Sequence, residues 1–385
     1  MSKNFALQSY YMSDEKDVVV VGGGFAGLAC ARAAATAGLK VVVLERKPDV
    51  GASPHTTGIL VGEVQDAWRF PSSLLRPIRG VRLYSPSLRS VDLERPGYAF
   101  HATDTPAALR WLAEEAEAAG AEVRTGSAWD GTPLPCRVLV GADGPRSRVA
   151  RRHGLGVNRE FLVGVEAEYE GVHGVDEDRL HCFLDSELAP GYLGWVVPGF
   201  GITQVGLACR APRTPRLDAL VRRLSRLFDF SRARIVGRRG GLIPVGGAVS
   251  PFSAHGVLLI GDAAGLVSPL TAGGIAYALR SGDLAGEAIA AHLLDGAPDP
   301  AEVLSAALPR FRWKRLLRHA IDLCPPNRLL EDLHRPRLAG LVRRQEQREH
   351  SLQPRAEGHA WKSFPEAERD RRRPLAKTIL PRSPG

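Results

Sequence analysis

Three glycines early in the chain have the spacing of a phosphate-binding turn. Gly22, Gly24 and Gly27 follow the apolar run DVVVV and open the helix-forming segment FAGLACARAAATAG. Glycine has no Cβ, so the backbone can turn tightly and approach a pyrophosphate, to which the first N–H groups of the next helix can donate. The strand, the turn and the helix follow one another as a dinucleotide site requires. We therefore predict that these glycines, with Phe25 and Ala26, bind a dinucleotide pyrophosphate.

An acidic residue completes this first motif. Glu45 lies 18 residues after Gly27 (45 − 27) and ends a second apolar run, KVVVLE. A carboxylate at the end of this strand accepts hydrogen bonds from ribose hydroxyls, and it repels the 2′-phosphate of NADP. We place Arg46, the next residue, in the same site. The alternative, a glycine-rich turn beside a surface glutamate, does not explain the order of strand, turn and helix.

Two later segments also place an aspartate after an apolar strand. Asp143 follows CRVLVGA, and Asp262 follows VLLIG and precedes a second glycine-containing helix start. The N–H groups at such a start stabilise negative charge. Taken alone, the first segment is an ordinary Asp-Gly turn, and the second is equally consistent with a helix start whose aspartate is satisfied locally. The cofactor-binding residues that we predict in the last segment are Gly261, Asp262, Pro269, Ala272, Gly273 and Gly274.

In this order and spacing, the three segments resemble the flavoproteins of the p-hydroxybenzoate-hydroxylase-like group, over roughly residues 15–320. Within that group, GDAAGLVSPLTAGGIAYALRSG is most similar to the geranylgeranyl reductase family. The resemblance implies an FAD cofactor with its ADP part at the glycine turn. It also implies that Asp143 lies near the pyrophosphate and that Asp262 contacts the ribityl–pyrophosphate region. Ser268, Pro269 and Leu270 are then expected to line the flavin ring.

The predicted substrate residues lie in the middle of the chain. The family carries a Tyr-x-Trp-x-Phe-Pro motif, to which Trp195 and Pro198 align here, with Tyr192 one place too early. Aromatic and proline side chains facing a flavin suit an apolar substrate, although Trp195 is equally consistent with ordinary sheet packing. His55, in the loop after the second strand, is our candidate catalytic proton donor, and the alternative is a surface histidine.

These residues need an α/β fold with an α+β insertion to position them. We expect a Rossmann-type FAD-binding domain with a parallel sheet, because buried apolar strands alternate with helices. It is discontinuous, residues 15–157 and 243–300, and part of 55–105 joins the substrate domain. Short alternating runs predict an antiparallel-sheet substrate domain over 158–242. Helices are expected over 301–344, at roughly 301–323 and 326–344, followed by a basic, flexible tail over 345–385.

Two enzymatic functions share all of these motifs, and we favour the first, with the second as its alternative. The first is an FAD-dependent reductase that passes hydride to an unsaturated, apolar, isoprenoid-like substrate. The second is an FAD-dependent monooxygenase that hydroxylates a small apolar or aromatic substrate through a flavin hydroperoxide. A flavin-binding protein without turnover and a tRNA-modifying flavoprotein are the remaining hypotheses. For the reductant we consider NAD(P)H and an electron-donor protein.

Composition narrows the setting in which this enzyme works. The chain has 385 residues, of which 44% are hydrophobic, and a net charge of +9. The segment 341–385 contributes 11 basic and 6 acidic residues, or +5, but no aromatic-interleaved basic motif, so no nucleic-acid partner is expected. Five scattered cysteines predict neither a metal site nor disulfides and favour the cytoplasm. Arginine-rich faces would suit peripheral membrane contact if the substrate is a lipid.

Overall fold

Six strands form the sheet that carries the glycine motif, in the order β15-β16-β9-β1-β2-β8. The computed structural model describes residues 16–323 and 325–331, all within the compact unit Met1–Arg335. Five of the strands run parallel, and β15 pairs antiparallel with β16. The strands are β1 (Lys16–Val21), β2 (Val41–Leu44), β8 (Glu122–Arg124), β9 (Cys136–Gly141), β15 (Ser253–Ala254) and β16 (Val257–Leu259).

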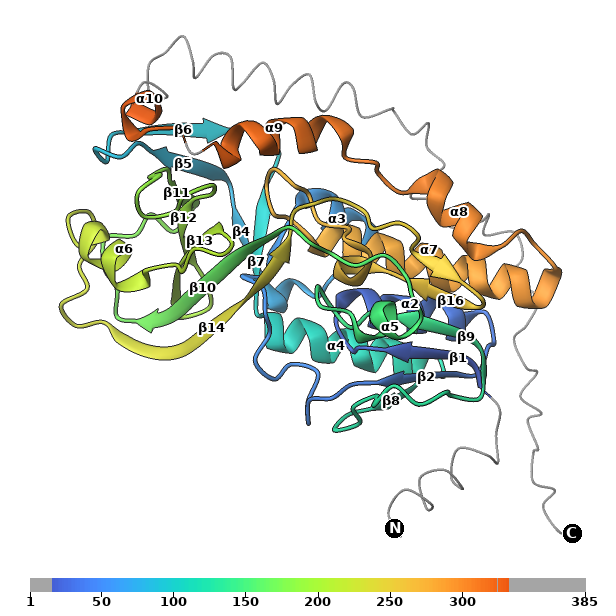
Figure 1. Cartoon of the computed structure of the whole chain (residues 1–385). Coiled ribbons are helices and arrows are strands. Elements are labelled where there is room, and N and C mark those ends of the chain that lie inside the picture. Colours follow the sequence, from blue (N-terminus) through green and yellow to red (C-terminus); the bar gives the residue numbers. More distant parts are fainter. Residues whose placement is uncertain (1–15, 324, 332–385) are drawn as a thin grey trace, which may run out of the picture. The chain divides into compact units, whose positions relative to one another are not determined.

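Both faces of this parallel sheet are covered, which explains its unbroken valine runs. In β1, Val18 and Val20 join one hydrophobic core, and Val19 and Val21 join another on the opposite face. The first core is formed with three helices, α2 (Phe25–Thr36), α4 (Thr105–Ala118) and α7 (Ile275–Asp295) (Figure 1). The second is closed by α5 (Arg148–Arg152) and the chain around it.

Small residues bring α2 and α7 into close contact. A Cβ added at Gly282 would lie 2.4 Å from the carbonyl oxygen of Ala26, and one added at Gly286 would lie 2.5 Å from that of Cys30. The two helices carry the first and the last of the predicted cofactor motifs. Their close packing therefore sets the distance between segments that lie about 250 residues apart in the sequence.

A second, seven-stranded sheet has the order β14-β10-β13-β12-β11-β5-β6 and is antiparallel except at the β11–β5 pair (Figure 1). Helix α6 (Leu217–Leu224) packs on one face of it. Its last two strands come from the segment 55–105. The strands are β5 (Gly80–Tyr84), β6 (Ser90–Glu94), β10 (Phe161–Glu170), β11 (Arg179–Phe183), β12 (Gly194–Pro198), β13 (Thr203–Arg210) and β14 (Arg234–Pro244).

Short elements fill the connections. A three-stranded sheet consists of β3 (Ile59–Leu60), β7 (Phe100–Thr103) and β4 (Leu75–Ile78). Helix α3 (Gly62–Trp68) and the 3₁₀ turns η1 (Ser72–Leu74) and η2 (Gly261–Ala264) complete this part. Near the C-terminus lie α8 (Pro300–Ala307), α9 (Arg312–Asp322) and α10 (Asn327–Leu330).

The fold class expected from the sequence is confirmed: a parallel Rossmann-type sheet, an antiparallel sheet and a helical C-terminal region. The single helix expected over 301–323 is wrong in detail. It breaks into α8 and α9 around Pro309, which cannot donate a backbone hydrogen bond. The tail 345–385 and most of the helix expected at 326–344 lie outside the described residues. No helix in the described part of the chain is long and apolar enough to cross a membrane.

Candidate functional site

The predicted cofactor residues meet at one edge of the parallel sheet. Four neighbouring strands of the sheet, in the order β16-β9-β1-β2, each end at one of the predicted cofactor segments. The glycine motif follows β1 and Glu45 follows β2. Asp143 follows β9, and Asp262 follows β16. The carboxyl ends of parallel strands lie on the same edge, where open α/β sheets bind their ligands. The third segment also touches the first, because a Cβ at Gly261 would lie 2.8 Å from the Cβ of Ala26.

Two glycines of the first motif are needed for different reasons. A Cβ at Gly27 would lie 1.9 Å from the carbonyl oxygen of Gly22, so close packing of helix and strand requires glycine there. Gly24 precedes α2 with φ −88° and ψ −175°, and a Cβ there would meet no atom within 4 Å. Neither the backbone nor the packing of this protein excludes a side chain at Gly24. The open space beside it, at an uncapped helix N-terminus, fits an approaching pyrophosphate.

Glu45 is buried and braces the turn. Its Oε2 accepts a hydrogen bond from the N–H of Gly23 (2.7 Å), and its Oε1 accepts one from the N–H of Lys47 (2.9 Å). A carboxylate has about four acceptor positions, so both oxygens keep capacity for ribose hydroxyls. Arg46 is exposed beside it. The ribose-binding role of Glu45 and the cofactor role of Arg46 stay predictions.

Asp143 caps a helix as well as adjoining the glycine turn. Its Oδ2 accepts hydrogen bonds from the N–H groups of Arg148 (2.6 Å) and Val149 (3.1 Å) at the start of α5. Its Oδ1 is buried and has no hydrogen-bond partner among the described residues. The backbone carbonyl of the preceding Ala142 would lie 2.3 Å from a Cβ at Gly22. Asp143 therefore offers a vacant acceptor close to the predicted pyrophosphate site.

Asp262 follows β16 and carries a carboxylate with a raised pKa. Burial raises its pKa to about 6, and no hydrogen bond to its carboxylate is found among the described residues. Its Oδ1 faces the backbone of Gly274, where a Cβ would lie 3.3 Å from that oxygen. A carboxylate that lacks donors is suited to accept hydrogen bonds from ribityl hydroxyls of a bound flavin nucleotide.

Asp262→Asn is expected to remove a pH dependence of the apoprotein's stability. The folded pKa is raised above the unfolded value, so stability is fully present below about pH 4 and is lost as pH rises towards about 6. The advantage of the variant should grow by about 1–2 kcal/mol between pH 4 and pH 7.5, allowing for partial exposure. Urea unfolding of both proteins at each pH measures this difference. A difference that stays constant with pH would contradict the assignment.

The segment predicted to face the flavin, residues 268–274, is connected directly to the antiparallel sheet. Ala272 adopts a left-handed backbone (φ 53°), and the glycines after it lead into α7, whose N-cap Gly274 supplies no side-chain cap. The hydroxyl of Tyr192 donates a hydrogen bond to the carbonyl oxygen of Thr271 (2.5 Å). Burial raises the pKa of Tyr192, so its hydroxyl stays protonated as this hydrogen bond requires. Pro269 is buried beneath the same turn.

Two of the three predicted substrate residues meet the predicted flavin-facing segment. Tyr192, Trp195 and Ala272 pack against one apolar cluster on the face of the sheet opposite α6; its buried members are Leu162, Ala208 and Val245. The indole of Trp195 lies along Gly206, where a Cβ would be 2.5 Å from the ring. Pro198 is buried, but strand alternation puts it on the other face, so it does not join Trp195.

Sequence reasoning missed a buried ion pair on the Trp195 face. Glu166 Oε2 accepts hydrogen bonds from Trp195 Nε1 (2.7 Å) and Thr57 Oγ1 (2.8 Å), and its Oε1 lies 3.0 Å from Nε of Arg239. Burial raises the pKa of Glu166, against the opposing charge of Arg239. Arg239 also donates to the carbonyl oxygen of Thr56 (2.9 Å). The sequence did hold a signal for this glutamate. Glu166 lies four residues after Leu162 on the same strand, and alternate residues of a strand point to the same face, so both side chains are expected to be buried together.

His55 lies in the loop that this ion pair anchors. Its side chain is exposed, and its Nδ1 donates to the carbonyl oxygen of Gly240 at 3.1 Å. Partial burial of the ring, helped by the nearby charge of Lys47, lowers the pKa of His55. The imidazolium is therefore scarcer near neutral pH than for an ordinary histidine. Its role as a proton donor stays a proposal.

The residues at this edge fit FAD. They combine an open space at Gly24, a vacant buried acceptor on Asp143 and a carboxylate without donors at Asp262. The start of α7 adds N–H groups that no side chain caps. The space at Gly24 beside the start of α2 suits a pyrophosphate, the acceptors on Asp143 and Asp262 suit hydroxyl groups of the sugar and ribityl parts, and the start of α7 suits the electron-rich side of a reduced flavin.

A family model described as FAD dependent oxidoreductase matches residues 17–124. Among curated relatives, digeranylgeranylglycerophospholipid reductase 2 of Methanopyrus kandleri is 34% identical over 315 residues, which cover 72% of this chain and 77% of the relative. The digeranylgeranylglycerophospholipid reductase of Methanosarcina acetivorans is 29% identical and covers 81% of this chain and 84% of the relative.

A solved structure has the same fold. It is the geranylgeranyl bacteriochlorophyll reductase-like protein of Thermoplasma acidophilum, with a TM-score of 0.74 and 22% identity over 83% of this chain and 90% of that one. The similarity extends through both sheets, beyond the residues that the family model matches. The resemblance noted from the three motifs is thereby confirmed.

Proposed function

Because this chain belongs to the geranylgeranyl reductase family of FAD-dependent oxidoreductases, we propose that it saturates carbon–carbon double bonds of an isoprenoid lipid. The observation that carries the proposal is the apolar cluster that Ala272 shares with Tyr192 and Trp195. It joins the segment expected against the flavin to an apolar face of the antiparallel sheet. The relatives' names favour a reductase over a monooxygenase.

The protein's own residues have three tasks in this reaction. Bound FAD would supply the hydride. The start of α2 at Gly24 would hold the pyrophosphate, and Asp262 would hold the ribityl chain. The start of α7 at Gly274 would stabilise negative charge on the reduced ring, because the helix dipole is positive there.

The Trp195 face would hold the hydrocarbon. At one end of this face, the residues beside the indole of Trp195 are Gly206, Ala208 and Gly164, whereas the charged residues Glu166, Glu168 and Arg239 lie level with Trp195 or towards the other end of the same strands. A flat apolar floor beside an indole suits a polyprenyl chain, which offers no hydrogen-bonding groups. Its double bonds could then lie between Trp195 and the turn at Ala272.

Anaerobic turnover tests this function directly. Purified protein, reconstituted with FAD and reduced by dithionite, is mixed without oxygen with a geranylgeranyl lipid in detergent. We expect flavin reoxidation and a product heavier by two hydrogens for each double bond, measured by mass spectrometry. Reoxidation only after oxygen is admitted, with one oxygen atom in the product, would reject the reductase in favour of the monooxygenase.

The same assay identifies the electron donor. NADH, NADPH and a reduced ferredoxin replace dithionite in parallel reactions, and the rate of flavin bleaching is measured for each. We propose a nicotinamide or a donor protein as the physiological reductant, and peripheral contact with a membrane as the place where the lipid is met. A donor that reduces the flavin at least about tenfold faster than the others is the physiological reductant.

A further inference from the structure

Helix α9 buries an arginine and leaves two of its large apolar residues exposed to solvent. Arg318 is 1% exposed, whereas Trp313 is 55% and Leu316 is 61% exposed. Leu323, just after α9, is 84% exposed, and Leu329 in α10 is 58% exposed. Apart from Leu294, the other exposed large apolar side chains among the described residues are 36–41% exposed. Such a concentration marks an interaction surface.

Buried contacts anchor α9, so its exposed residues do not belong to a frayed end. The guanidinium of Arg318 donates to the carbonyl oxygen of Gly191, and its Nε lies 3.0 Å from Oδ1 of Asp322. Asp322 also pairs with Arg210 of β13 at 3.5 Å. Gly191 immediately precedes Tyr192, whose hydroxyl contacts the flavin-facing turn. The helix is thus fixed next to the loop that carries Tyr192.

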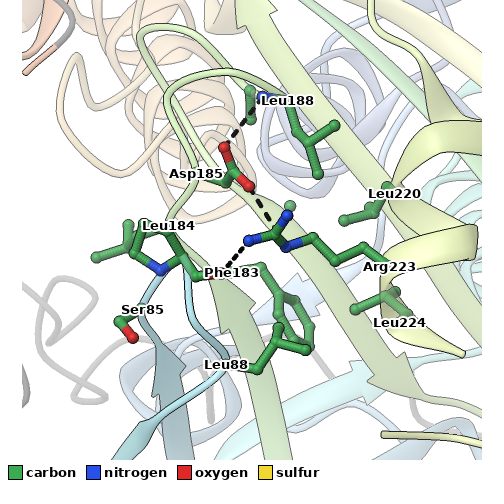
Figure 2. Close-up of a pocket in the computed structure, with 12 residues that line it drawn as sticks. Ser85, Leu88, Phe183, Leu184, Asp185, Leu188, Leu220, Arg223 and Leu224 are labelled. Atoms are coloured by element: carbon green, nitrogen blue, oxygen red, sulfur yellow. Dashed lines mark hydrogen bonds and ion pairs between the residues drawn. The ribbon is translucent and has the colours of Figure 1, made fainter. Parts of the chain in front are cut away.

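The short helix α10 is anchored just as firmly. The side chain of Asn327 accepts hydrogen bonds from the backbone N–H of Ser186 (2.8 Å) and donates to Oδ1 of Asp185 (3.0 Å). Asp185 is itself buried and pairs with Arg223 of α6 at 3.5 Å, at a small pocket on the face of the sheet opposite Trp195 (Figure 2). This pocket lies where α6 meets the sheet, so it serves packing. The α9–α10 surface is therefore preformed.

The pattern along α9 indicates what covers this surface. Apolar positions 313, 316, 320 and 323 follow helical spacing and form one ridge. Exposed basic residues form a neighbouring ridge: Arg312, Arg315 and His319. An apolar ridge with tryptophan beside a basic ridge matches a phospholipid surface, where apolar side chains enter the acyl boundary and cations meet anionic headgroups.

We propose that α9 and α10 form a docking surface for an anionic phospholipid bilayer, next to the loop of Gly191 and Tyr192. The docking surface consists of Arg312, Trp313, Arg315, Leu316, Leu323 and Leu329. Only the identity of the lipid substrate taken from the bilayer rests on the proposed function. Binding to vesicles itself needs no turnover. Docking would bring the substrate to Gly191 and Tyr192 without passage through water.

Vesicle sedimentation of the full-length, FAD-loaded protein tests the docking surface. The vesicles contain phosphatidylcholine with or without roughly 30% phosphatidylglycerol. The anionic lipid is included because it attracts each basic residue near the membrane surface with about 1 kcal/mol. We expect binding to the anionic vesicles to weaken at least tenfold in Leu316→Glu, because one buried leucine is worth roughly that factor. Leu294→Glu is the matched control, because Leu294 is 55% exposed on α7, outside the docking surface. It should bind within about twofold of the parent.

Each outcome decides one proposal separately. Parent protein that does not sediment, or Leu316→Glu that binds like the parent, overturns the docking surface. The proposal is also overturned if the parent does not bind vesicles and light scattering shows that it is a dimer which Leu316→Glu dissociates. A second copy of the chain would then cover this face. Activity on detergent-dispersed substrate should be equal in parent and variant. Vesicle binding without any such activity would refute the proposed function and leave the docking surface intact.

Discussion

Gly24→Val is expected to weaken FAD binding by about 100-fold or more while the apoprotein stays folded, with a melting temperature within about 3 °C of the parent. The extended backbone at Gly24 (φ −88°, ψ −175°) suits a β-branched residue, and a Cβ there meets no protein atom within 4 Å. The new side chain would instead occupy the space beside the N-terminus of α2. Loss of two charge-assisted hydrogen bonds to the pyrophosphate, at about 1.5–3 kcal/mol each, weakens binding by about 100-fold or more.

The measurement is a fluorescence titration of apoprotein with FAD, alongside thermal unfolding without FAD. Gly27→Val provides the contrasting control, since its Cβ would lie 1.9 Å from the carbonyl oxygen of Gly22. That variant should lose stability even without the cofactor. If Gly24→Val bound FAD within threefold of the parent, the glycine turn would not be the pyrophosphate site.

Arg239→Met is expected to cost about 3–5 kcal/mol of unfolding free energy at pH 8, because it leaves a buried carboxylate without its cation. The side chains of Glu166 and Arg239 are only 4% and 9% exposed, and their Oε1 and Nε atoms are 3.0 Å apart. Glu168, the second carboxylate that pairs with Arg239, is more exposed and contributes less to the loss.

The pH dependence of this loss has a definite sign. Burial already raises the pKa of Glu166 in the folded state, and removal of the guanidinium raises it further. A carboxyl group whose pKa is higher in the folded than in the unfolded protein causes no loss of stability while it is protonated in both states, below its unfolded pKa. Above that pKa, the free energy of unfolding falls as the pH rises. The cost of Arg239→Met should therefore be smaller at pH 5 than at pH 8.

The double variant Glu166→Gln/Arg239→Met separates charge from shape. Glutamine keeps an acceptor for Trp195 and Thr57 but carries no charge, so most of the lost stability should return. Urea unfolding of the parent, both single variants and the double variant at pH 5 and pH 8 measures the coupling. A double variant as unstable as Arg239→Met alone would mean that the ion pair does not cause the loss.

The cofactor edge of the parallel sheet was readable from the chain. Unbroken valine runs predict strands covered on both faces, and Gly24, Glu45, Asp143 and Asp262 each follow such a run. Parallel strands bring their carboxyl ends to one edge, so these residues needed no long-range contact to be placed.

The substrate side was not readable in this way. Trp195 could be named, but its meeting with Ala272 depends on how two sheets pack, and Pro198 falls on the far face through strand alternation. The ion pair of Glu166 and Arg239 joins two residues that are 73 positions apart in the sequence (239 − 166). They face each other because β10 and β14 pair antiparallel, and the register of this pair shifts at a bulge between Glu168 and Tyr169.

The amino-acid sequence by itself determined the βαβ unit and the strand ends at which the predicted cofactor residues lie, because apolar period, glycine position and helix propensity act over a few neighbouring residues. Only the tertiary structure decided which face of the antiparallel sheet meets the turn at Ala272, which we predict to face the flavin. It also decided that α9 would bury Arg318 and expose Trp313. Both depend on contacts between distant segments, in which a buried partner such as Asp322 or Gly191 overrides the local preference of a side chain.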